Sequence, residues 1–458
     1  VEDGDNYYYV DANGAMVKNT WVAIAADEDE EEDVDYRWYY FGSSGKAYKD
    51  STGKTINGKK YGFDEEGKML FGFVDANGAS INTEDDAILN CTYYYGTNDD
   101  GARHSGWLRY EDGFDSTDYD DLDYAYYWFN FDSNGKKRTD IVKKINGEWY
   151  NFDPNGVMLT EWEGTTPGDS ATGSRYFNDN LENGSLEKNA WVWTSAPDSW
   201  IEESKDYLDD SEHWFRTDNK GKVISDQTKK INSKWYVFDE WGVMQYGLVL
   251  LTDDKVSGSS LNSAYDIDGK ISHGVIDEDD VEAADIYATD GNLFYFSNNE
   301  ESDGAMKTGS SITISLADDD YVFGFEKTSG EALCGIDNNK VYRNGIRQEA
   351  DDDKYAIVLG GKGTDVKEYL VNSTGTRMKV NKYYKNDNDE YYVVIDGKDS
   401  TGFTIFPGAD ANGEPIYEPI TNSKLASALA KADVTTLEEA EDFIEEWLAD
   451  KDNVDEER

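Results

Sequence analysis

The chain has 458 residues, of which 38% are hydrophobic and 14% aromatic, and it carries a formal net charge of −53. This charge excludes nucleic acid as a partner, because that affinity depends on Lys and Arg that neutralise phosphates. No run of eighteen apolar residues occurs, so we expect no membrane insertion. Few aliphatic residues, together with 33 Tyr, 13 Trp and 42 Gly, favour many small hairpins that share thin cores between neighbours.

The first predicted hairpin spans 7–21, where an aromatic strand meets the turn 11–14 and the return strand ends at Trp21. An acidic insertion at 27–35 then separates it from a set of three predicted hairpins. A second insertion at 112–123 and a third at 202–212 precede further sets of the same kind. The aromatic strands of these sets turn at glycines, among them Gly45, Gly67, Gly101 and Gly156.

The clearest unit is 143–162, which reads KKINGEWYNFDPNGVMLTEW. A tight turn at 145–147 precedes an aromatic strand at 148–152, and the turn 153–156 leads into a return strand. Along this strand Tyr150 and Phe152 share one face and Trp149 lies on the other. Similar units begin at Ile56 and Ile231, so the chain has a period of about 85–90 residues.

Three segments follow from this pattern. Residues 1–275 contain the aromatic-rich repeats with acidic insertions, and 276–405 contain degenerate repeats whose strands lack tryptophan. Residues 406–458 contain a linker and two helical patches, 425–431 and 437–448, the second opened by a capping box of Thr436 and Glu439. The helices either cap the repeats or begin a further domain.

These units resemble the cell-wall-binding repeats of Gram-positive surface proteins, a family that includes choline-binding repeats, glucan-binding repeats and the repetitive oligopeptides of clostridial toxins. The shared pattern is an aromatic pair, a turn glycine, a methionine and a Gly-Trp position. Here it reads Trp149-Tyr150, Gly156, Met158 and Glu161-Trp162. The resemblance implies an all-β fold, a β-solenoid of stacked β-hairpins with a short C-terminal helical segment.

The resemblance also implies ligand sites between consecutive hairpins, where aromatic rings of neighbouring hairpins meet. The residues that it assigns to ligand binding are Trp21, Trp38, Trp107, Trp128, Trp149, Trp162, Trp191, Trp214 and Trp235. It places Trp21 with Trp38, Trp107 with Trp128, and Trp162 and Trp191 with Trp214. An aromatic cage binds a quaternary ammonium, and the same rings stack on sugars. The alternative is that these tryptophans form the core between hairpins. The methionines after the turn glycines are expected to fill gaps in that core; they are Met16, Met69, Met158, Met244 and Met306.

Catalysis is not expected. The three histidines, at 104, 213 and 273, form no triad or zinc spacing, and the many carboxylates single out no catalytic pair. No cofactor is expected. Clustered carboxylates at 115–120 and 318–320 raise Ca²⁺ as an alternative, although neither segment matches a calcium-binding loop. Cys91 and Cys334 stand in different repeats and are interpreted as unpaired thiols.

The leading hypothesis is a secreted, cell-surface binding module that recognises cell-wall polymer or a carbohydrate, either a glucan or a choline-like ligand. The chain begins directly in repeat sequence, as expected for a mature or trimmed piece of a longer protein. The alternative is an adhesin or spacer scaffold whose partner is a host surface protein. Fully buried tryptophans would favour the scaffold.

Overall fold

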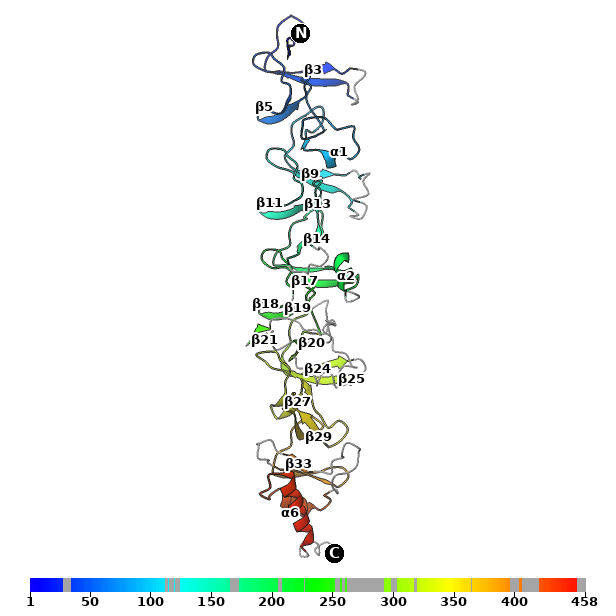
Figure 1. Ribbon diagram of the computed structural model, residues 1–458, viewed down its shortest axis with the longest axis vertical. Helices are drawn as coiled ribbons and strands as arrows, with labels where there is room; N and C mark the ends of the chain where they lie inside the picture. The colour runs from blue at the N-terminus through cyan, green and yellow to red at the C-terminus, as the bar shows by residue number, and fades with distance from the viewer. Residues whose placement is uncertain are drawn as a thin grey trace. The chain divides into compact units, whose positions relative to one another are not determined.

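The computed structural model describes residues 1–27, 34–111, 114, 119, 124–164, 173–204, 208–225, 227–251, 256–257, 260–261, 292–297, 303–316, 319–363, 365–395, 403–405 and 420–450. They form successive antiparallel β-hairpins followed by two helices, which confirms the predicted fold of stacked hairpins (Figure 1). The chain divides into two compact units. Unit 1 comprises 1–164, 174–189 and 219–222, and unit 2 comprises the rest. The expected segment boundaries at 275–276 and 405–406 involve residues outside the described ranges.

The described residues of unit 1 form seven short sheets. Their strands are β1 (Glu2–Asp3) with β2 (Asn6–Tyr7), β3 (Thr20–Ala25) with β4 (Tyr36–Phe41), β5 (Ser51–Ile56) with β6 (Lys59–Phe63), β7 (Phe73–Val74) with β8 (Tyr93–Tyr94), β9 (Gly106–Tyr110) with β10 (Tyr127–Phe131), β11 (Ile141–Ile145) with β12 (Glu148–Phe152) and β13 (Met158–Leu159), and β14 (Glu161–Glu163) with β15 (Arg175–Phe177). A four-residue helix, α1 (Ala87–Asn90), lies between β7 and β8 in sequence.

Unit 2 continues the hairpins and adds a larger sheet. Its strands are β16 (Trp191–Ser195) with β17 (Glu212–Arg216), β18 (Gln227–Ile231) with β19 (Lys234–Phe238), β20 (Leu248–Leu251) with β23 (Asn292–Tyr295), β21 (Val256–Ser257) with β22 (Ser260–Leu261), the sheet of β24 (Gly309–Leu316), β25 (Asp319–Phe325), β28 (Ile346–Arg347), β27 (Lys340–Arg343) and β26 (Gly335–Asp337), then β29 (Tyr355–Gly360) with β30 (Lys367–Asn372), and β31 (Lys382–Lys385), β32 (Tyr391–Ile395) and β33 (Phe403–Ile405). Its helices are α2 (Asp198–Ser204), α5 (Ser423–Leu429) and α6 (Leu437–Ala449).

Local sequence explains the hairpins. Between β11 and β12, Asn146 and Gly147 take φ values of 50° and 104°, so both central residues of a two-residue turn have the positive φ that matches strand twist. The turn after β12 is held by Asp153, whose Oδ1 accepts a hydrogen bond from Val157 N at 2.7 Å. Both turns were predicted from the sequence, and both are present.

The acidic insertions do not separate sets of hairpins. Strands on either side of each insertion pair with one another: β3 with β4, β9 with β10, and β16 with β17. Each insertion therefore belongs to the connection inside one hairpin. The sequence interpretation was wrong here because a long charged segment resembles a linker, whereas the entropy of closing a loop rises only slowly with its length.

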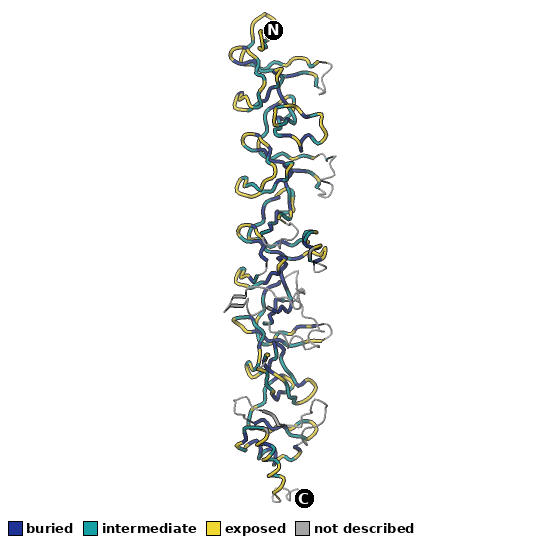
Figure 2. The backbone as a smooth tube through the Cα atoms, in the orientation of Figure 1, coloured by how far each residue is buried: buried dark blue, intermediate teal, exposed yellow. Residues whose placement is uncertain are grey.

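Consecutive hairpins join through backbone hydrogen bonds and thin apolar layers. Met69 N donates to Trp38 O at 2.7 Å, and Met244 N donates to Trp214 O at 2.8 Å. Side chains such as Phe63 and Phe152 are almost fully buried in these layers. Figure 2 shows buried backbone along the middle of the hairpins and exposed backbone at their loops. In the part of the chain that the structure describes, such clusters combine side chains of neighbouring hairpins, so these hairpins stabilise one another.

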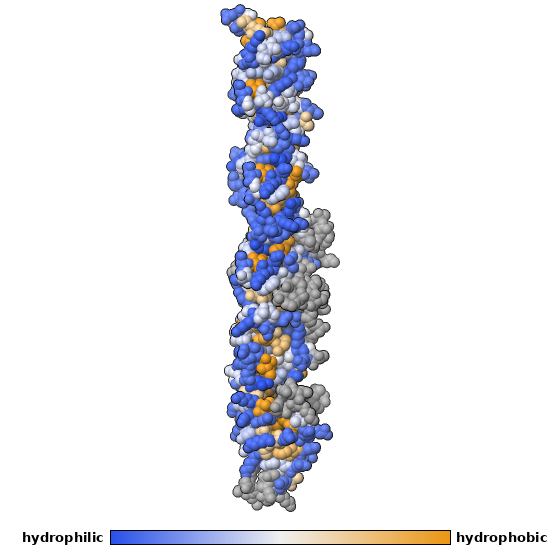
Figure 3. Space-filling view, turned by 90° about the vertical axis from the view of Figure 1, so that its left-hand side faces the viewer, coloured by the Kyte–Doolittle hydropathy of each residue, from blue (hydrophilic) through white to orange (hydrophobic). Residues whose placement is uncertain are grey.

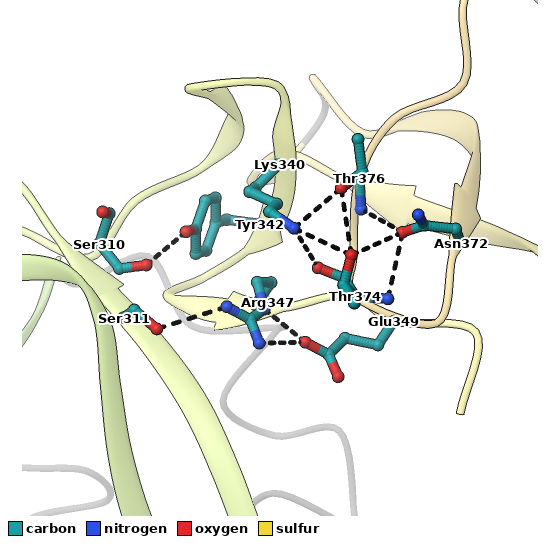
Figure 4. A network of polar contacts seen from close by, with 9 residues as sticks. All are labelled: Ser310, Ser311, Lys340, Tyr342, Arg347, Glu349, Asn372, Thr374 and Thr376. Atoms are coloured by element: carbon teal, nitrogen blue, oxygen red, sulfur yellow. Dashed lines mark hydrogen bonds and ion pairs between the residues drawn. The ribbon is translucent and has the colours of Figure 1, made fainter. Parts of the chain in front are cut away.

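Where the strands of unit 2 lack tryptophan, polar contacts link β27 to the turn after β30 (Figure 4). Lys340 Nζ donates to the hydroxyl oxygens of Thr374 and Thr376, at 3.2 and 2.8 Å. Tyr342 donates its hydroxyl to Ser310 O at 2.6 Å, which connects β27 to β24.

The C-terminal helices pack on the last sheet. Leu425 and Leu429 of α5 are buried in one cluster with Val393 and Ile395 of β32. At the start of α6, Thr436 Oγ1 accepts from Glu439 N at 3.2 Å, as predicted. In a capping box the glutamate would accept from the backbone N–H of the N-cap residue, Thr436. Here the Glu439 carboxylate accepts from the N–H of the preceding residue, Thr435, at 2.7 Å.

The surface in Figure 3 is mostly hydrophilic, with hydrophobic residues in small separate patches. Among the described residues, none of the helices combines the length and the apolar character needed to cross a membrane.

Candidate ligand-binding sites

Three clusters of aromatic and methionine side chains recur with the long period of the chain. The first cage consists of Trp21, Trp38, Tyr61 and Met69; the second cage of Trp107, Trp128, Tyr150 and Met158; the third cage of Trp191, Trp214, Tyr236 and Met244. The first and second cages lie in unit 1 and the third in unit 2.

The geometry of the cages is nearly constant. In the second cage the rings of Trp107 and Trp128 lie 6.1 Å apart at 86°, and Tyr150 lies 4.8 Å from Trp107. The same pairs are separated by 6.5 and 4.9 Å in the first cage and by 6.2 and 4.9 Å in the third. In the first and third cages the two indoles meet at 90° and 86°. The chain therefore builds one arrangement three times, with two indoles at right angles and a phenol beside them.

Strand pairing explains why the two indoles meet. Trp107 on β9 lies opposite Asn130 on β10, and Trp128 stands two residues before Asn130, on the same face. The two indoles are thus diagonal neighbours across one hairpin. Tyr150 comes from β12, in the next hairpin along the chain. The same register places Trp191 opposite Arg216, two residues after Trp214.

Each cage includes a methionine that packs on the turn glycine of the following hairpin. Met69, Met158 and Met244 are each only 3% exposed, as the predicted gap-filling role requires. A Cβ added to Gly184 would lie 2.4 Å from Met158 Cε, and similar contacts join Gly101 to Met69 and Gly304 to Met244. Any larger residue in these turns would displace the methionine. Met16, near the N-terminus, is 40% exposed.

The second and third cages line open hollows of about 180 and 360 Å³. A carboxylate from the turn that carries the glycine lines each of them: Glu182 in the second and Asp303 in the third. Glu182 accepts from the Tyr126 hydroxyl at 2.8 Å and lies 3.5 Å from Arg109 Nη1. The hollows of the second and third cages are therefore small and half-open. The carboxylate on each is paired with a cation of the protein, and Lys234, 3.6 Å from Asp303, also lines the third hollow.

The surroundings of Asp303, in the third cage, favour the ionised form of its carboxylate. Burial raises the pKa of Asp303, but the hydrogen bond from Lys307 at 2.6 Å, the Ala305 N–H and the charges of Lys307 and Lys234 outweigh it, so the pKa lies below the ordinary carboxyl value. Burial, and then the charge of Asp303, raise the pKa of Tyr236, which keeps its phenol neutral.

Six of the nine predicted tryptophans lie in the cages, and three do not. Trp149 and Trp235 directly precede Tyr150 and Tyr236, so they lie on the opposite face of their strands. Trp149 is 37% exposed, and Lys230 Nζ lies 5.7 Å from the ring centroid of Trp235. Trp162 packs edge-on against Tyr176 at 5.1 Å.

The sequence assignment did not include the tyrosine walls or the carboxylates of the turns. The tyrosines Tyr61, Tyr150 and Tyr236 have a usable signal, because they are separated by the same long period as the tryptophans. Glu182 and Asp303 have a weaker signal, since each only precedes a turn glycine by one or two residues.

The described residues offer no group of three or more His, Cys, Asp or Glu side chains that could hold a metal ion. Of the segments considered for Ca²⁺, 115–118, 120 and 318 lie outside the described residues. Asp320 lies on β25 and accepts a hydrogen bond from Ser315 at 2.5 Å. Cys91 and Cys334 are both free.

The fold and these sites together define a protein of aromatic β-hairpin repeats. No family model matches the chain, and no curated protein matches its sequence. Among solved structures, the chain is similar to the modular autolysin LytC from Streptococcus pneumoniae in complex with a synthetic peptidoglycan ligand, with 16% identity, 83% of this chain and 52% of that chain covered, and a TM-score of 0.30. The match thus spans about half the length of that autolysin.

Two further structures from Streptococcus pneumoniae are similar over most of their own length. Choline binding protein F, in the presence of a peptidoglycan analogue, is 18% identical over 73% of this chain and 97% of that chain, with a TM-score of 0.35. CbpJ is 17% identical over 72% and 91%, with a TM-score of 0.37. The predicted resemblance to cell-wall-binding repeats is confirmed.

Proposed function

We propose that the chain is a non-catalytic, secreted surface module that binds a cell-wall polymer through quaternary ammonium groups held in the three cages. The observation that carries this proposal is the threefold recurrence of two perpendicular indoles, a phenol and a methionine with nearly identical spacing. A core that served packing alone would not require the same four side-chain types at every third hairpin.

The arrangement of the rings favours a cation over a neutral sugar. Indoles at 86–90° form the walls of a small recess, whereas a pyranose stacks best on one flat, open ring. Each ring attracts an ammonium by about 0.5–2 kcal/mol. Glu182 and Asp303 place a carboxylate beside the second and third cages, each of them paired with a cation of the protein.

An arginine of the protein already lies near one of these rings. The Arg216 guanidinium lies 5.5 Å from the ring centroid of Trp191, in the third cage. Burial lowers the pKa of this guanidinium below its ordinary value. The Arg216 guanidinium thus lies beside the Trp191 indole although burial removes part of its hydration. Attraction between a cation and an aromatic ring is strongest where both are partly desolvated.

Exposure of the rings favours binding over the spacer function. All the indoles and phenols of the three cages are half-buried, so none of them is fully enclosed in the core. A scaffold that used these side chains only as core would bury them, as Trp200 is buried at 0% exposure.

Ligand titration tests the proposal. Tryptophan fluorescence is followed while choline, its neutral isostere 3,3-dimethylbutan-1-ol, or α-glucan oligosaccharides are added. We expect a saturable change with choline, a much weaker response to the isostere and none with the glucans. Saturable binding of glucans and not of choline would show that the cages recognise a carbohydrate and not an ammonium group. Retention of the chain on isolated cell walls that choline does not elute would show that it binds the wall through a different site.

A further inference from the structure

We propose that the chain has two further binding sites outside the cages, each for one acidic sugar residue of a glycan, formed by Trp149 with Lys144 and by Trp235 with Lys230. At each site the indole stacks on the pyranose ring and the lysine pairs with the carboxylate of the sugar. This inference goes beyond the proposed function, because none of these four side chains belongs to a cage.

Each of these two indoles is a single ring. Trp149 O accepts from Leu186 N at 2.8 Å, the same contact that joins a methionine to the second indole of a cage, and Trp235 O accepts from Met306 N at 2.8 Å. Both indoles therefore occupy a cage position in the next interface. Among the described residues, however, no other aromatic side chain is in ring contact with either of them. Because an aromatic cage holds an ammonium with several rings, whereas a sugar stacks on one flat face, the lone indoles favour a sugar.

A lysine lies directly across the hairpin from each indole. Lys144 on β11 is opposite Trp149 on β12, and Lys230 on β18 is opposite Trp235 on β19. Residues in such positions share one face of the sheet, with Cβ atoms about 4.5–5.5 Å apart, and Lys230 Nζ lies 5.7 Å from the ring centroid of Trp235. Trp149 and both lysines are exposed, and Trp235 is half-buried. Each hairpin thus presents a ring and an ammonium side by side.

These lysines have no ionic partner in the part of the chain that the structure describes. The chain has 96 acidic residues against 43 Lys and Arg, and other lysines are paired, as Lys188 is with Glu148 at 3.0 Å. Lys144 and Lys230, like the lysines that precede them at 143 and 229, form no such pair with any described residue. A cation left unpaired among so many carboxylates is available to an anion from outside, and the overall negative charge confines that anion to such local cationic surface.

The ring and the ammonium together select the class of ligand. A neutral sugar would contact only the indole, and an inorganic anion would contact only the lysine. An acidic pyranose such as a uronic acid has an apolar C–H face and a carboxylate at its rim, so it contacts both. The flexible lysine stem lets the ammonium reach that rim.

The β5–β6 hairpin, the first copy of this unit, lacks the site. Lys60 takes the place of the indole there, and Thr55 lies opposite it. The inference therefore predicts two sites, one on β11–β12 in unit 1 and one on β18–β19 in unit 2.

Saturation-transfer difference NMR, which suits weak ligands, tests the sites with trigalacturonic acid, and the trimethyl ester of this trisaccharide serves as the uncharged sugar of the same shape. Choline is present at saturating concentration throughout, so that the cages are occupied. We expect the acid to bind under these conditions and the ester to bind about 1.5- to 5-fold more weakly, because an exposed ion pair is lost. Salt should reduce this preference for the acid.

Two double variants separate the two contacts. Trp149→Leu with Trp235→Leu should abolish binding of both the acid and the ester. Lys144→Gln with Lys230→Gln should leave the ester bound and remove the preference for the acid. Both double variants should keep the choline stoichiometry of the intact chain, which shows that the fold and the cages are intact. Should the tryptophan variant fail to fold, the lysine variant, with its substitutions at exposed positions, still decides.

The outcomes separate this inference from the proposed function. Displacement of trigalacturonic acid by choline would place the sugar in the cages and overturn the two sites. Equal affinity of the intact chain for the acid and the ester, an unchanged preference in the lysine variant, or absence of sugar binding would also overturn them. So would undiminished binding to the tryptophan variant. Absence of choline binding to the intact chain would overturn the proposed function alone.

Discussion

Replacing Trp128 by Leu tests whether the rings of a cage bind the ligand or only fill space. Leucine keeps an apolar side chain at this position on β10 and removes the aromatic face. Trp128 lies 6.1 Å from Trp107 and lines the hollow of the second cage. The substitution therefore removes one wall and leaves Trp107 and Tyr150 in place.

The magnitude follows from the contact that is lost. One ring contributes about 0.5–2 kcal/mol to the binding of an ammonium, so affinity at the second cage should fall by about 2- to 30-fold. The two other cages share no residue with it and should keep their affinity. At choline concentrations that saturate only intact cages, the stoichiometry should decrease by one equivalent.

Isothermal titration calorimetry with choline measures both quantities, and 3,3-dimethylbutan-1-ol serves as the uncharged ligand of the same shape. The matched control is Trp149→Leu, since Trp149 is 37% exposed and lies outside every cage. This control should leave the choline stoichiometry unchanged. Equal affinity for choline and its isostere, or an equal effect of both variants, would refute the argument from cation–π contacts.

Three further outcomes are expected. Gly184→Ala should weaken choline binding at the second cage, because the added Cβ would lie 2.4 Å from Met158 Cε. Gly147→Ala, whose Cβ meets nothing within 4 Å, should cost only backbone strain, about 1–2 kcal/mol in urea unfolding, and leave choline binding unchanged. Equal effects of the two variants on choline binding would exclude this role of the methionine. The pKa of Asp303 is lowered, so the contribution of its carboxylate to stability is present above the ordinary carboxyl pKa and is lost as the pH falls through the lower folded value. The difference in melting temperature between the intact chain and Asp303→Asn should therefore vanish at low pH. A melting-temperature difference that does not change with pH would contradict this. Thr436→Ala should destabilise α6 by about 1 kcal/mol, seen as faster hydrogen exchange of its amides, and unchanged exchange would show that the cap contributes little.

Local chemistry made the hairpins predictable. Residues 146 and 147 read Asn-Gly, a pair that strongly prefers a two-residue turn, and the alternation in β12 placed Trp149 and Tyr150 on opposite faces. These are short-range preferences, which a single sequence expresses fully. The N-cap at Thr436 was predictable for the same reason.

The cages needed information that no local pattern contains. The resemblance paired Trp107 with Trp128, and the structure brings them together. No local pattern gives the reason, because the acidic segment at 112–123 hides the pairing of β9 with β10 that makes them diagonal neighbours. The third wall, Tyr150, depends on how one hairpin stacks on the next.

Calorimetric titration of choline into the intact chain and into a variant with Trp38, Trp128 and Trp214 all replaced by Leu tests the account most directly. We predict three equivalents for the intact chain and, in the triple variant, an affinity lower by about 2- to 30-fold at each cage, with the β-sheet circular dichroism spectrum preserved. Undiminished binding in that folded triple variant would contradict the account.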